Sequence, residues 1–264
     1  MTKPATRAAA VASTGVLVVE RRPGVLVLRL CRPAKLNALD HALIEALLDA
    51  LDSAQRDDDV RAIVIRGEGR AFCAGIDLDQ VRALATKSAI KSHAALVARL
   101  QSAFRDVDKP VICGVHGYAF GAGCGLVAAS DIAIAARSAK FGYPEVTRNV
   151  LPALVLPSLV RQVGRKAAFH LVASGAAVDA ATAATLGLVT MIVDDADLED
   201  ATLRMAGELA QRDPHTLAAL KRLFMEVTEL PFPQALRRAR AVNEDLRGDN
   251  VRAGRRVRTV RDTA

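Results

Sequence analysis

The segment that most constrains the fold is GYAFGAGCGLVAASD, Gly117 to Asp131, which carries four glycines within nine residues. It follows an apolar run, KPVICGVHG, that predicts a buried strand, and it continues into small apolar residues that indicate a helix. A strand, a glycine-rich turn and a helix in this order present free backbone N–H groups at the positive end of the helix. The segment is therefore a candidate site for an anion.

The glycine pattern does not match the known phosphate-binding turns. G-A-G-C-G is neither G-x-G-x-x-G nor G-x-x-x-x-G-K-[ST], and no Lys follows it. A smaller anion, such as the oxyanion that develops on a carbonyl, suits the turn better, and an oxyanion hole needs two donors. FCAGID, another turn of small residues at a predicted helix start, is the candidate for the second donor. Taken singly, either turn also fits a purely structural role in close packing.

Strands and helices alternate along the chain up to about residue 195, which indicates an α/β core. GVLVVERRPGVLVLRL predicts a β-hairpin about a Pro-Gly turn, and an amphipathic helix capped by Asp40 follows it. From Ala196 onward the pattern predicts three helices, which are interrupted at Asp213-Pro214 and at Pro231 to Pro233. Asp77 is predicted to cap a further helix.

These patterns divide the chain into three parts. We expect a disordered tail over 1–14, the core over 15–205 and a helical region over 206–264.

Composition narrows the class of protein. Half of the 264 residues are hydrophobic, with no Trp and two Tyr, so the core is predicted to be aliphatic. The scarcity of aromatic residues weighs against nucleic-acid binding by base stacking, although the net charge of +7 favours anionic partners. The sequence contains neither a signal peptide nor an uncharged apolar run of about 18 residues, so we expect a cytoplasmic protein without a membrane span. The cysteines, expected to be buried reduced thiols without a metal, are Cys31, Cys73, Cys113 and Cys124.

Several motifs together resemble those of the crotonase superfamily of enoyl-CoA hydratases and isomerases. AFCAGIDL and KPVICGVHGYAFGAGCGLVAASDIAIA occur in the family's order and spacing with RPAKLNAL, AKFGYPEV and AATLGLVTMIV. The resemblance extends from about Gly15 to Asp213. It implies an α/β spiral of ββα units with C-terminal helices that support trimerisation, often as a dimer of trimers. It also implies an acyl-CoA substrate, with coenzyme A as part of the substrate and no prosthetic group.

By position in the resembled motifs, the oxyanion hole consists of the backbone N–H groups of Ala74 and Ala122. Gly121 and Gly123 are expected to let the backbone approach the ligand closely. The loop RPAKLN is similar to the one that contacts the adenosine part of coenzyme A in the family, which assigns this contact to Lys35 and Arg32. Near the C-terminus, AGRRVR places Arg258 where the family usually has Phe.

Hydratases of the resembled family use two glutamates to handle water. One lies in GGGCEL, and the corresponding position here is Gly125 in GAGCGL. The other lies in F-G-x-P-E, and here it is Glu145 in FGYPEV. An apolar pocket raises the pKa of a carboxyl group, which suits Glu145 to proton transfer on an acyl thioester. The alternative is a glutamate in a surface salt bridge at the end of a strand.

A single glutamate resembles the family's isomerases, so isomerase-like proton transfer is the first interpretation and hydration or dehydration the second. Hydration would need a replacement acid, for which the candidates are Asp77, Asp79, Glu68 and His93. The segment NVLPALVLPSLVRQVGRKAAFH also resembles crotonase-like dehydratases that act on 3-hydroxy-3-methylglutaryl groups, which keeps dehydration open.

Two interpretations outside enzyme chemistry remain. Loss of the glutamate at Gly125 also fits a non-catalytic acyl-CoA-binding protein. The C-terminal 29 residues, 236–264, carry nine arginines against four acids, which fits RNA binding of the kind that parts of the family show, or a 3′-phosphate contact. A binding constant that does not change with salt would exclude the RNA interpretation.

Overall fold

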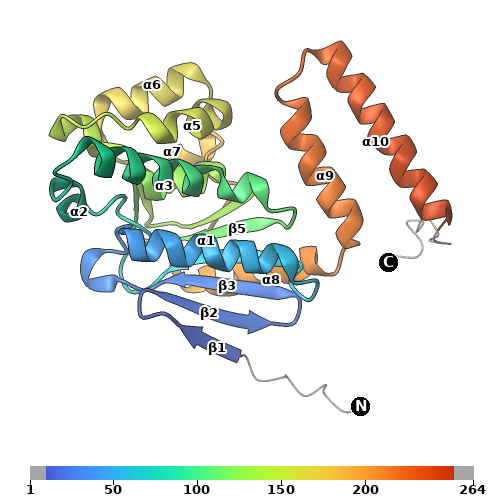
Figure 1. The fold of residues 1–264 in the computed structure, drawn as a ribbon, viewed down its shortest axis with the longest axis horizontal. Coiled ribbons are helices and arrows are strands. Elements are labelled where there is room, and N and C mark those ends of the chain that lie inside the picture. Colours follow the sequence, from blue (N-terminus) through green and yellow to red (C-terminus); the bar gives the residue numbers. More distant parts are fainter. Residues whose placement is uncertain (1–9, 253–264) are drawn as a thin grey trace. The chain divides into compact units, whose positions relative to one another are not determined.

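A computed structural model describes residues 10–252, which form two compact units that divide between Gln211 and Arg212 (Figure 1). The first unit is built on a seven-stranded sheet of order β1-β2-β3-β4-β5-β7-β10. Its strands are β1 (Ala10–Ser13), β2 (Leu17–Arg22), β3 (Val25–Leu30), β4 (Ala62–Gly67), β5 (Val111–Val115), β7 (Ile132–Ala136) and β10 (Met191–Val193).

The sheet is antiparallel at one edge and parallel in the rest. β1, β2 and β3 pair antiparallel, and β3, β4, β5, β7 and β10 pair parallel. The β2–β3 hairpin turns at Pro23-Gly24, where Gly24 has a φ of +71°, as the Pro-Gly signal predicts. The predicted α/β core is confirmed.

Helices cover both faces of this sheet and complete the first unit. They are α1 (His41–Arg56), α2 (Leu78–Arg82), α3 (Lys87–Asp106), α4 (Ala122–Ala129), α5 (Leu156–Val163), α6 (Arg165–Ser174), α7 (Ala180–Thr185) and α8 (Leu198–Ala210). Asp40 caps α1 as predicted, since its Oδ1 accepts the Leu43 N–H at 2.8 Å. Asp77 likewise caps α2 through the Asp79 N–H. Among the described helices, none combines the length and apolar character needed to cross a membrane.

Alternate residues of each central strand enter different cores, because successive side chains in a strand point to opposite faces. Leu28 of β3 and Ile65 of β4 belong to the larger core, which also contains the apolar sides of α1 and α3. Val27 and Val64 belong to the smaller core under α8. In Figure 1, α1 lies in front of the sheet and α8 behind it.

A second, three-stranded sheet carries the loops of the candidate site. Its order is β6-β8-β9, in which β6 (Tyr118–Phe120) pairs parallel with β8 (Lys140–Gly142), and β8 pairs antiparallel with β9 (Val178–Asp179). β6 leads directly into α4, and β8 leads into the short 3-10 helix η2 (Pro144–Arg148).

The second unit contains α9 (Pro214–Val227) and α10 (Phe232–Arg252), joined by a short turn. α9 begins at the predicted break, with Pro214 at its first position and Asp213 as its N-cap. The Arg238 guanidinium of α10 donates to Glu226 of α9 at 3.0 Å. The three helices predicted after residue 196 are thus α8, α9 and α10.

Two predicted boundaries are wrong. The prediction of a disordered tail over 1–14 is wrong for Ala10–Ser13, which form β1 because they pair with β2 and so extend the sheet. Residues 1–9 lie outside the described range. The core, predicted to end at residue 205, extends to Gln211. α8 runs unbroken through the predicted boundary because its buried residues, including Ala206 and Ala210, pack on the sheet.

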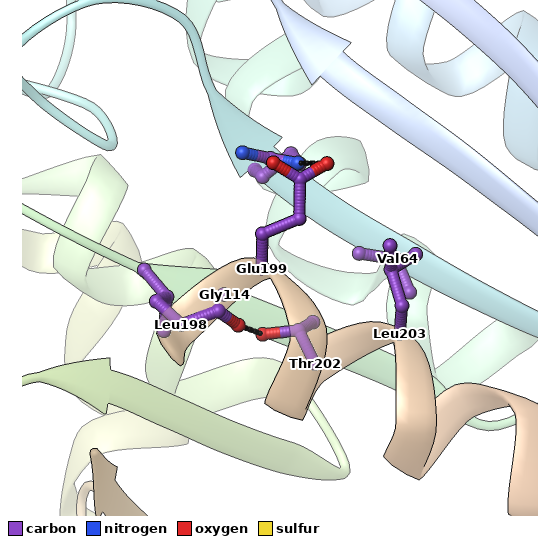
Figure 2. Close-up of a pocket in the computed structure, with 7 residues that line it drawn as sticks. Val64, Gly114, Leu198, Glu199, Thr202 and Leu203 are labelled. Atoms are coloured by element: carbon purple, nitrogen blue, oxygen red, sulfur yellow. Dashed lines mark hydrogen bonds and ion pairs between the residues drawn. The ribbon is translucent and has the colours of Figure 1, made fainter. Parts of the chain in front are cut away.

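The contact between α8 and β5, where Gly114 and Thr202 lie (Figure 2), leaves no room for a side chain at Gly114. A Cβ at Gly114 would lie 2.9 Å from Thr202 Oγ1 and 3.2 Å from Thr202 Cγ2. Thr202 is buried, and its hydroxyl donates to the Leu198 carbonyl at 2.7 Å. The cavity at this contact is about 10 Å³, which is no larger than one water requires. This face of the sheet therefore has a structural role.

Gly114→Ala is expected to lower the free energy of unfolding by about 1–3 kcal/mol, because its Cβ overpacks the contact with Thr202. Urea denaturation measures the change. In a Thr202→Ala background the same substitution should cost much less, since the colliding atoms are absent. Additive effects of the two substitutions would contradict this account.

Candidate functional site

The N-terminus of α4 is the first component of the site. Gly121 precedes the helix with a φ of +53° and a ψ of −124°, a conformation that residues with a Cβ rarely adopt. All eight residues of α4 are buried. Within the described residues, the first N–H of the helix, that of Ala122, has no acceptor. This N–H lies at a helix N-terminus and can therefore donate a hydrogen bond to an anionic oxygen.

The loop between β4 and α2 approaches this helix terminus at backbone distance. A Cβ at Gly75 would lie 3.0 Å from the Phe120 carbonyl and 3.5 Å from the Ala122 nitrogen. Gly75 has a φ of +99°, so the loop both turns and packs here without a side chain. The two turns singled out in the sequence are therefore in contact.

The prediction that Ala74 supplies the second oxyanion donor is contradicted by its hydrogen bonding. The Ala74 N–H donates to the Leu36 carbonyl at 3.0 Å. This bond fastens the loop to the segment before α1, and it takes up the N–H that the prediction requires to be free.

Ile76, two residues further, has its N–H on the other side of the loop. Leu39 N–H donates to the Gly75 carbonyl at 2.7 Å, and Asp77 N–H donates to the Leu39 carbonyl at 2.9 Å. In such a parallel bridge the N–H of the residue between the two bonds points away from the partner strand. In the part of the chain that the structure describes, no acceptor for the Ile76 N–H is found.

Asn37 holds this arrangement together, and the sequence analysis did not single it out. Its side chain is fully buried and donates through Nδ2 to the carbonyls of Glu68 and Ala71, both at 2.8 Å. Its Oδ1 accepts the Arg32 N–H at 2.8 Å. Its φ of +55° is one that Asn tolerates better than most residues. An Asn in the RPAKLNAL loop was the available signal, because it can combine this backbone conformation with local hydrogen bonds.

Glu145 lies beside the start of α4, on η2. A Cβ at Gly121 would lie 2.5 Å from Glu145 Oε1, so the carboxylate occupies the space that the glycine leaves open. Glu145 is half-buried, and its Oε2 has no hydrogen-bond partner among the described residues. Burial raises the pKa of its carboxyl group, while its own backbone N–H and the charge of Arg148 act in the opposite direction. The alternative of a surface salt bridge does not fit a carboxylate with an unpartnered, buried oxygen.

Gly125 faces a side chain that the sequence analysis missed, Gln101 of α3. A Cβ at Gly125 would lie 2.6 Å from Gln101 Oε1 and 3.1 Å from Gln101 Nε2. The Gln101 side chain therefore fills the space into which a side chain at position 125 would extend. No spacing in the sequence relates a residue on one helix to a glycine on the next, so this neighbour required the structure.

Gly123 has a different role from the predicted one. A Cβ there would lie 2.3 Å from the Cys73 carbonyl oxygen, so this glycine allows close packing of α4 on the preceding loop rather than approach of a ligand. Cys73 and the nearby Cys124 are fully buried, and burial raises the pKa of each thiol to about 12. Both thiols are consequently protonated at neutral pH.

An open cavity of about 480 Å³ lies next to these components. This volume is in the range of small-molecule sites. Its lining includes Ile76, Phe120 and Pro144, which lie close in the chain to the site's loops and to Glu145, and it also includes Arg148. Lys35 also lines the cavity and forms an exposed ion pair with Asp79 at 2.7 Å, so its position is compatible with the predicted coenzyme contact.

Arg32, in contrast, is held inside the protein. Its Nη2 lies 3.0 Å from Asp40 Oδ2 and 2.9 Å from Asp77 Oδ2, and its Nη1 donates to the Ala38 carbonyl. Two carboxylates balance its charge, so the predicted contact between Arg32 and a phosphate of coenzyme A is contradicted. Arg32 instead ties the loop before α1 to the cap of α2.

The candidate replacement acids all have other partners. Asp77 binds Arg32, and Asp79 binds Lys35. Glu68 Oε2 lies 3.1 Å from Arg29, and His93 Nδ1 lies 2.9 Å from His41 Nε2. The group that the structure places against Gly125 is therefore a neutral amide rather than an acid.

Part of the basic C-terminal segment lies beyond the described range. Arg258 and the motif AGRRVR are outside the described residues. Within the described range, no group of three or more His, Cys, Asp or Glu side chains is arranged to hold a metal ion.

Comparison with known proteins identifies relatives over most of the chain. The sequence profile of the enoyl-CoA hydratase/isomerase family matches residues 20–256. The chain is 36% identical over 227 residues to the 2,3-dehydroadipyl-CoA hydratase of Escherichia coli (strain K12), covering 85% of this chain and 87% of that protein. It is 35% identical over 209 residues to the 1,2-epoxyphenylacetyl-CoA isomerase of the same organism, covering 75% and 77%.

The fold also has close counterparts among solved structures. An enoyl-CoA hydratase from Mycobacterium smegmatis superposes with a TM-score of 0.84 at 34% identity, covering 87% of this chain and 90% of that one. A putative enoyl-CoA hydratase/isomerase (crotonase) from Legionella pneumophila gives the same TM-score and identity, covering 90% and 92%. The α/β fold with C-terminal helices, which the motif resemblance implied, is thereby confirmed.

Asn37→Ala is expected to lower the free energy of unfolding by about 2–4 kcal/mol, because it removes three hydrogen bonds and leaves buried backbone groups unpaired. Thermal or urea denaturation measures the loss. Asn37→Asp is the matched control for shape: it keeps the Oδ1 acceptor but loses both Nδ2 donors, so it should also destabilise. A near-neutral Asn37→Ala would show that the loop does not depend on this side chain.

Proposed function

This chain belongs to the enoyl-CoA hydratase/isomerase family, and on that basis we propose that it moves a proton on the acyl group of an enoyl-CoA thioester, with Glu145 as both base and acid. One observation carries this proposal. The Glu145 carboxylate lies against the N-terminus of α4 with a buried, unpartnered oxygen and a raised pKa. A carboxylate with a raised pKa is a stronger base than an exposed one, which suits it to removing a proton from carbon.

The thioester oxygen would accept hydrogen bonds from the N–H groups of Ala122 and Ile76. Both are free of other acceptors within the described residues, and they lie on the two turns that meet at Gly75. Each donor directed at a developing oxyanion contributes about 3 kcal/mol to transition-state stabilisation in comparable sites. In our proposal, Ile76 rather than Ala74 supplies the second oxyanion donor.

Double-bond migration needs only one carboxylate. Glu145 removes a proton from carbon 2 of a 3-enoyl thioester, and the electron pair of that C–H bond delocalises into the thioester carbonyl. The resulting dienolate takes the proton back at carbon 4, and the double bond then lies between carbons 2 and 3. The absence of a carboxylate at Gly125 favours this reaction.

Hydration, with its reverse, is the second candidate, and the Gln101 amide beside Gly125 favours it. An amide cannot accept the proton of water at neutral pH, but it can hold a water molecule while Glu145 accepts that proton. Relatives named as hydratases and one named as an isomerase both align with the chain. A protein that binds an acyl-CoA but converts neither an enoyl-CoA nor a 3-hydroxyacyl-CoA would instead be a non-catalytic binding protein.

We further propose that coenzyme A enters only as part of the substrate, with Lys35 near its route, and that no prosthetic group takes part. Assembly as a trimer or a dimer of trimers is proposed from the apolar side chains that the second unit exposes, which include Phe224 at 62% and Phe232 at 78%. Buried free thiols at Cys73, Cys113 and Cys124 suit the reducing cytoplasm.

The proposal predicts that the protein converts a 3-enoyl-CoA to the 2-enoyl isomer in D₂O, and that Glu145→Gln slows this by at least about 100-fold because general acid–base catalysis is lost. Mass spectrometry distinguishes the two candidates, since migration conserves the elements of the substrate and hydration adds those of water. Binding of a saturated acyl-CoA should be nearly unchanged in the variant. Full activity of Glu145→Gln would refute the role of Glu145.

The raised pKa of Glu145 also predicts a pH-dependent stability. A carboxyl group whose pKa is higher in the folded state favours folding fully below its unfolded pKa, and this contribution is lost as the pH rises through the folded pKa. Glu145→Gln should therefore have a higher Tm than the wild type at pH 7, with the difference shrinking toward about pH 4. Glu45→Gln, an exposed position on α1, is the control and should show no such trend. A difference in Tm that does not depend on pH would contradict the burial of an ionised Glu145.

A further inference from the structure

We propose that the Gln101 carboxamide binds an oxygen at carbon 3 of the acyl group, and so makes the site selective for 3-hydroxyacyl-CoA thioesters over unsubstituted ones. The inference rests on the proposed function, because it takes a CoA thioester bound at the α4 terminus as its starting point. It adds a substrate class and the residue that recognises it.

The first argument is position. Gly121 and Gly125 lie one turn apart on α4, as the bond from Gly125 N–H to the Gly121 carbonyl at 2.9 Å shows. Residues four apart lie on the same face of a helix, and neither of these two carries a side chain. Together they form a strip of α4 that bears no side chains. Glu145 Oε1 lies over the first glycine and the Gln101 amide over the second. One helical turn is about 5.4 Å, so a small group held between them can reach both.

The second argument is hydrogen bonding. Gln101 is 5% exposed, and its Oε1 has no hydrogen-bond partner in the described part of the chain. Glu145 Oε2, on the same strip, is also unpartnered. Buried polar atoms in folded proteins nearly always have a partner, and each exception requires an explanation. Two unpaired acceptors at one site indicate a ligand that donates hydrogen bonds, such as a hydroxyl group or a water molecule.

A purely structural role accounts for only part of Gln101. Its Nε2 makes one long contact of 3.4 Å with the Ala122 carbonyl, which orients the amide. That bond uses the donor end of the side chain and leaves the acceptor end without a partner. An apolar side chain would fill the same space without burying an unpaired oxygen, at less cost to stability.

The chemistry at this position balances with one carboxylate. Water donates one hydrogen bond to Gln101 Oε1 and transfers its other proton to Glu145 as its oxygen bonds to carbon 3. The π electrons of the 2,3 double bond move to the thioester oxygen, and Glu145 then gives the proton to carbon 2. One water has been added, Gln101 has exchanged no proton, and the product keeps its 3-hydroxyl against the amide.

The experiment compares the dissociation constants of 3-hydroxybutyryl-CoA and butyryl-CoA by calorimetry on the full-length protein. We expect the wild type to bind the 3-hydroxy thioester about tenfold more tightly, the effect of one buried hydrogen bond. Gln101→Leu should abolish this preference and leave the binding of butyryl-CoA unchanged. Ser102→Ala, at a half-buried position whose hydroxyl donates to the Arg99 carbonyl within the same helix, is the matched control and should retain the preference.

Two further variants keep the test decisive if Gln101→Leu does not fold. Gln101→Asn retains the amide but shortens its reach by one methylene group, so the preference should fall. Gly125→Ala should displace the amide, because its Cβ would lie 2.6 Å from Gln101 Oε1 and 2.7 Å from Val155 Cγ1. Three results would overturn the inference. The preference could persist in these variants, the variants could weaken the binding of both thioesters equally, or the wild type could show no preference.

Turnover is measured separately from binding. A wild type that prefers the 3-hydroxy thioester through Gln101 but turns over no substrate would overturn the proposed function and support this inference. A wild type that turns over enoyl-CoA without a preference that depends on Gln101 would support the proposed function and overturn this inference.

Discussion

The site depends on how closely other segments approach the backbone of α4. Gly121 admits the Glu145 carboxylate, Gly123 admits the Cys73 carbonyl, and Gly125 admits the Gln101 amide, each within 2.6 Å of where a Cβ would stand. Any side chain at these positions would push away a partner that the site uses. The glycines therefore serve mainly to bring two polar side chains and a second loop against one helix terminus. The free N–H of Ala122 becomes useful only because these groups surround it.

The availability of a backbone N–H is decided by its neighbours rather than by the motif that contains it. Ala74 and Ile76 lie two residues apart in the same loop, yet the Ala74 N–H is bonded to Leu36, whereas the Ile76 N–H has no acceptor among the described residues. Asn37 causes this difference indirectly, because its hydrogen bonds hold the segment before α1 against the loop. Donors held by a buried network are preorganised, and so need little rearrangement when charge develops on a bound carbonyl.

Local features of the sequence predicted what depends on local interactions. The Pro-Gly hairpin, the caps at Asp40 and Asp77 and the helix starts near Pro214 and Pro231 follow from signals within a few residues, and the structure contains all of them. Glu145 was singled out from its motif alone, and the structure has its carboxylate beside Gly121. The errors involve tertiary contacts that no local pattern signals: Arg32 is neutralised by Asp40 and by the distant Asp77, and β1 forms because β2 offers a free edge. Gln101 belongs to the same class, since only packing of α3 on α4 brings it to Gly125.

A neutral amide in place of a carboxylate changes the electrostatics of Glu145. A carboxylate at position 125 would repel the carboxylate of Glu145, and the pKa of one of the two groups would rise further. Beside Gln101, the pKa of Glu145 is instead raised by burial and moderated by its own backbone N–H and by Arg148. Glu145 then acts as base first and as acid afterwards with the same proton. In the proposed chemistry, this order of proton transfers suits double-bond migration and water addition equally well. What separates the two reactions is whether an oxygen is held at carbon 3, and on this strip of α4 the side chain that can hold one without taking up its proton is Gln101.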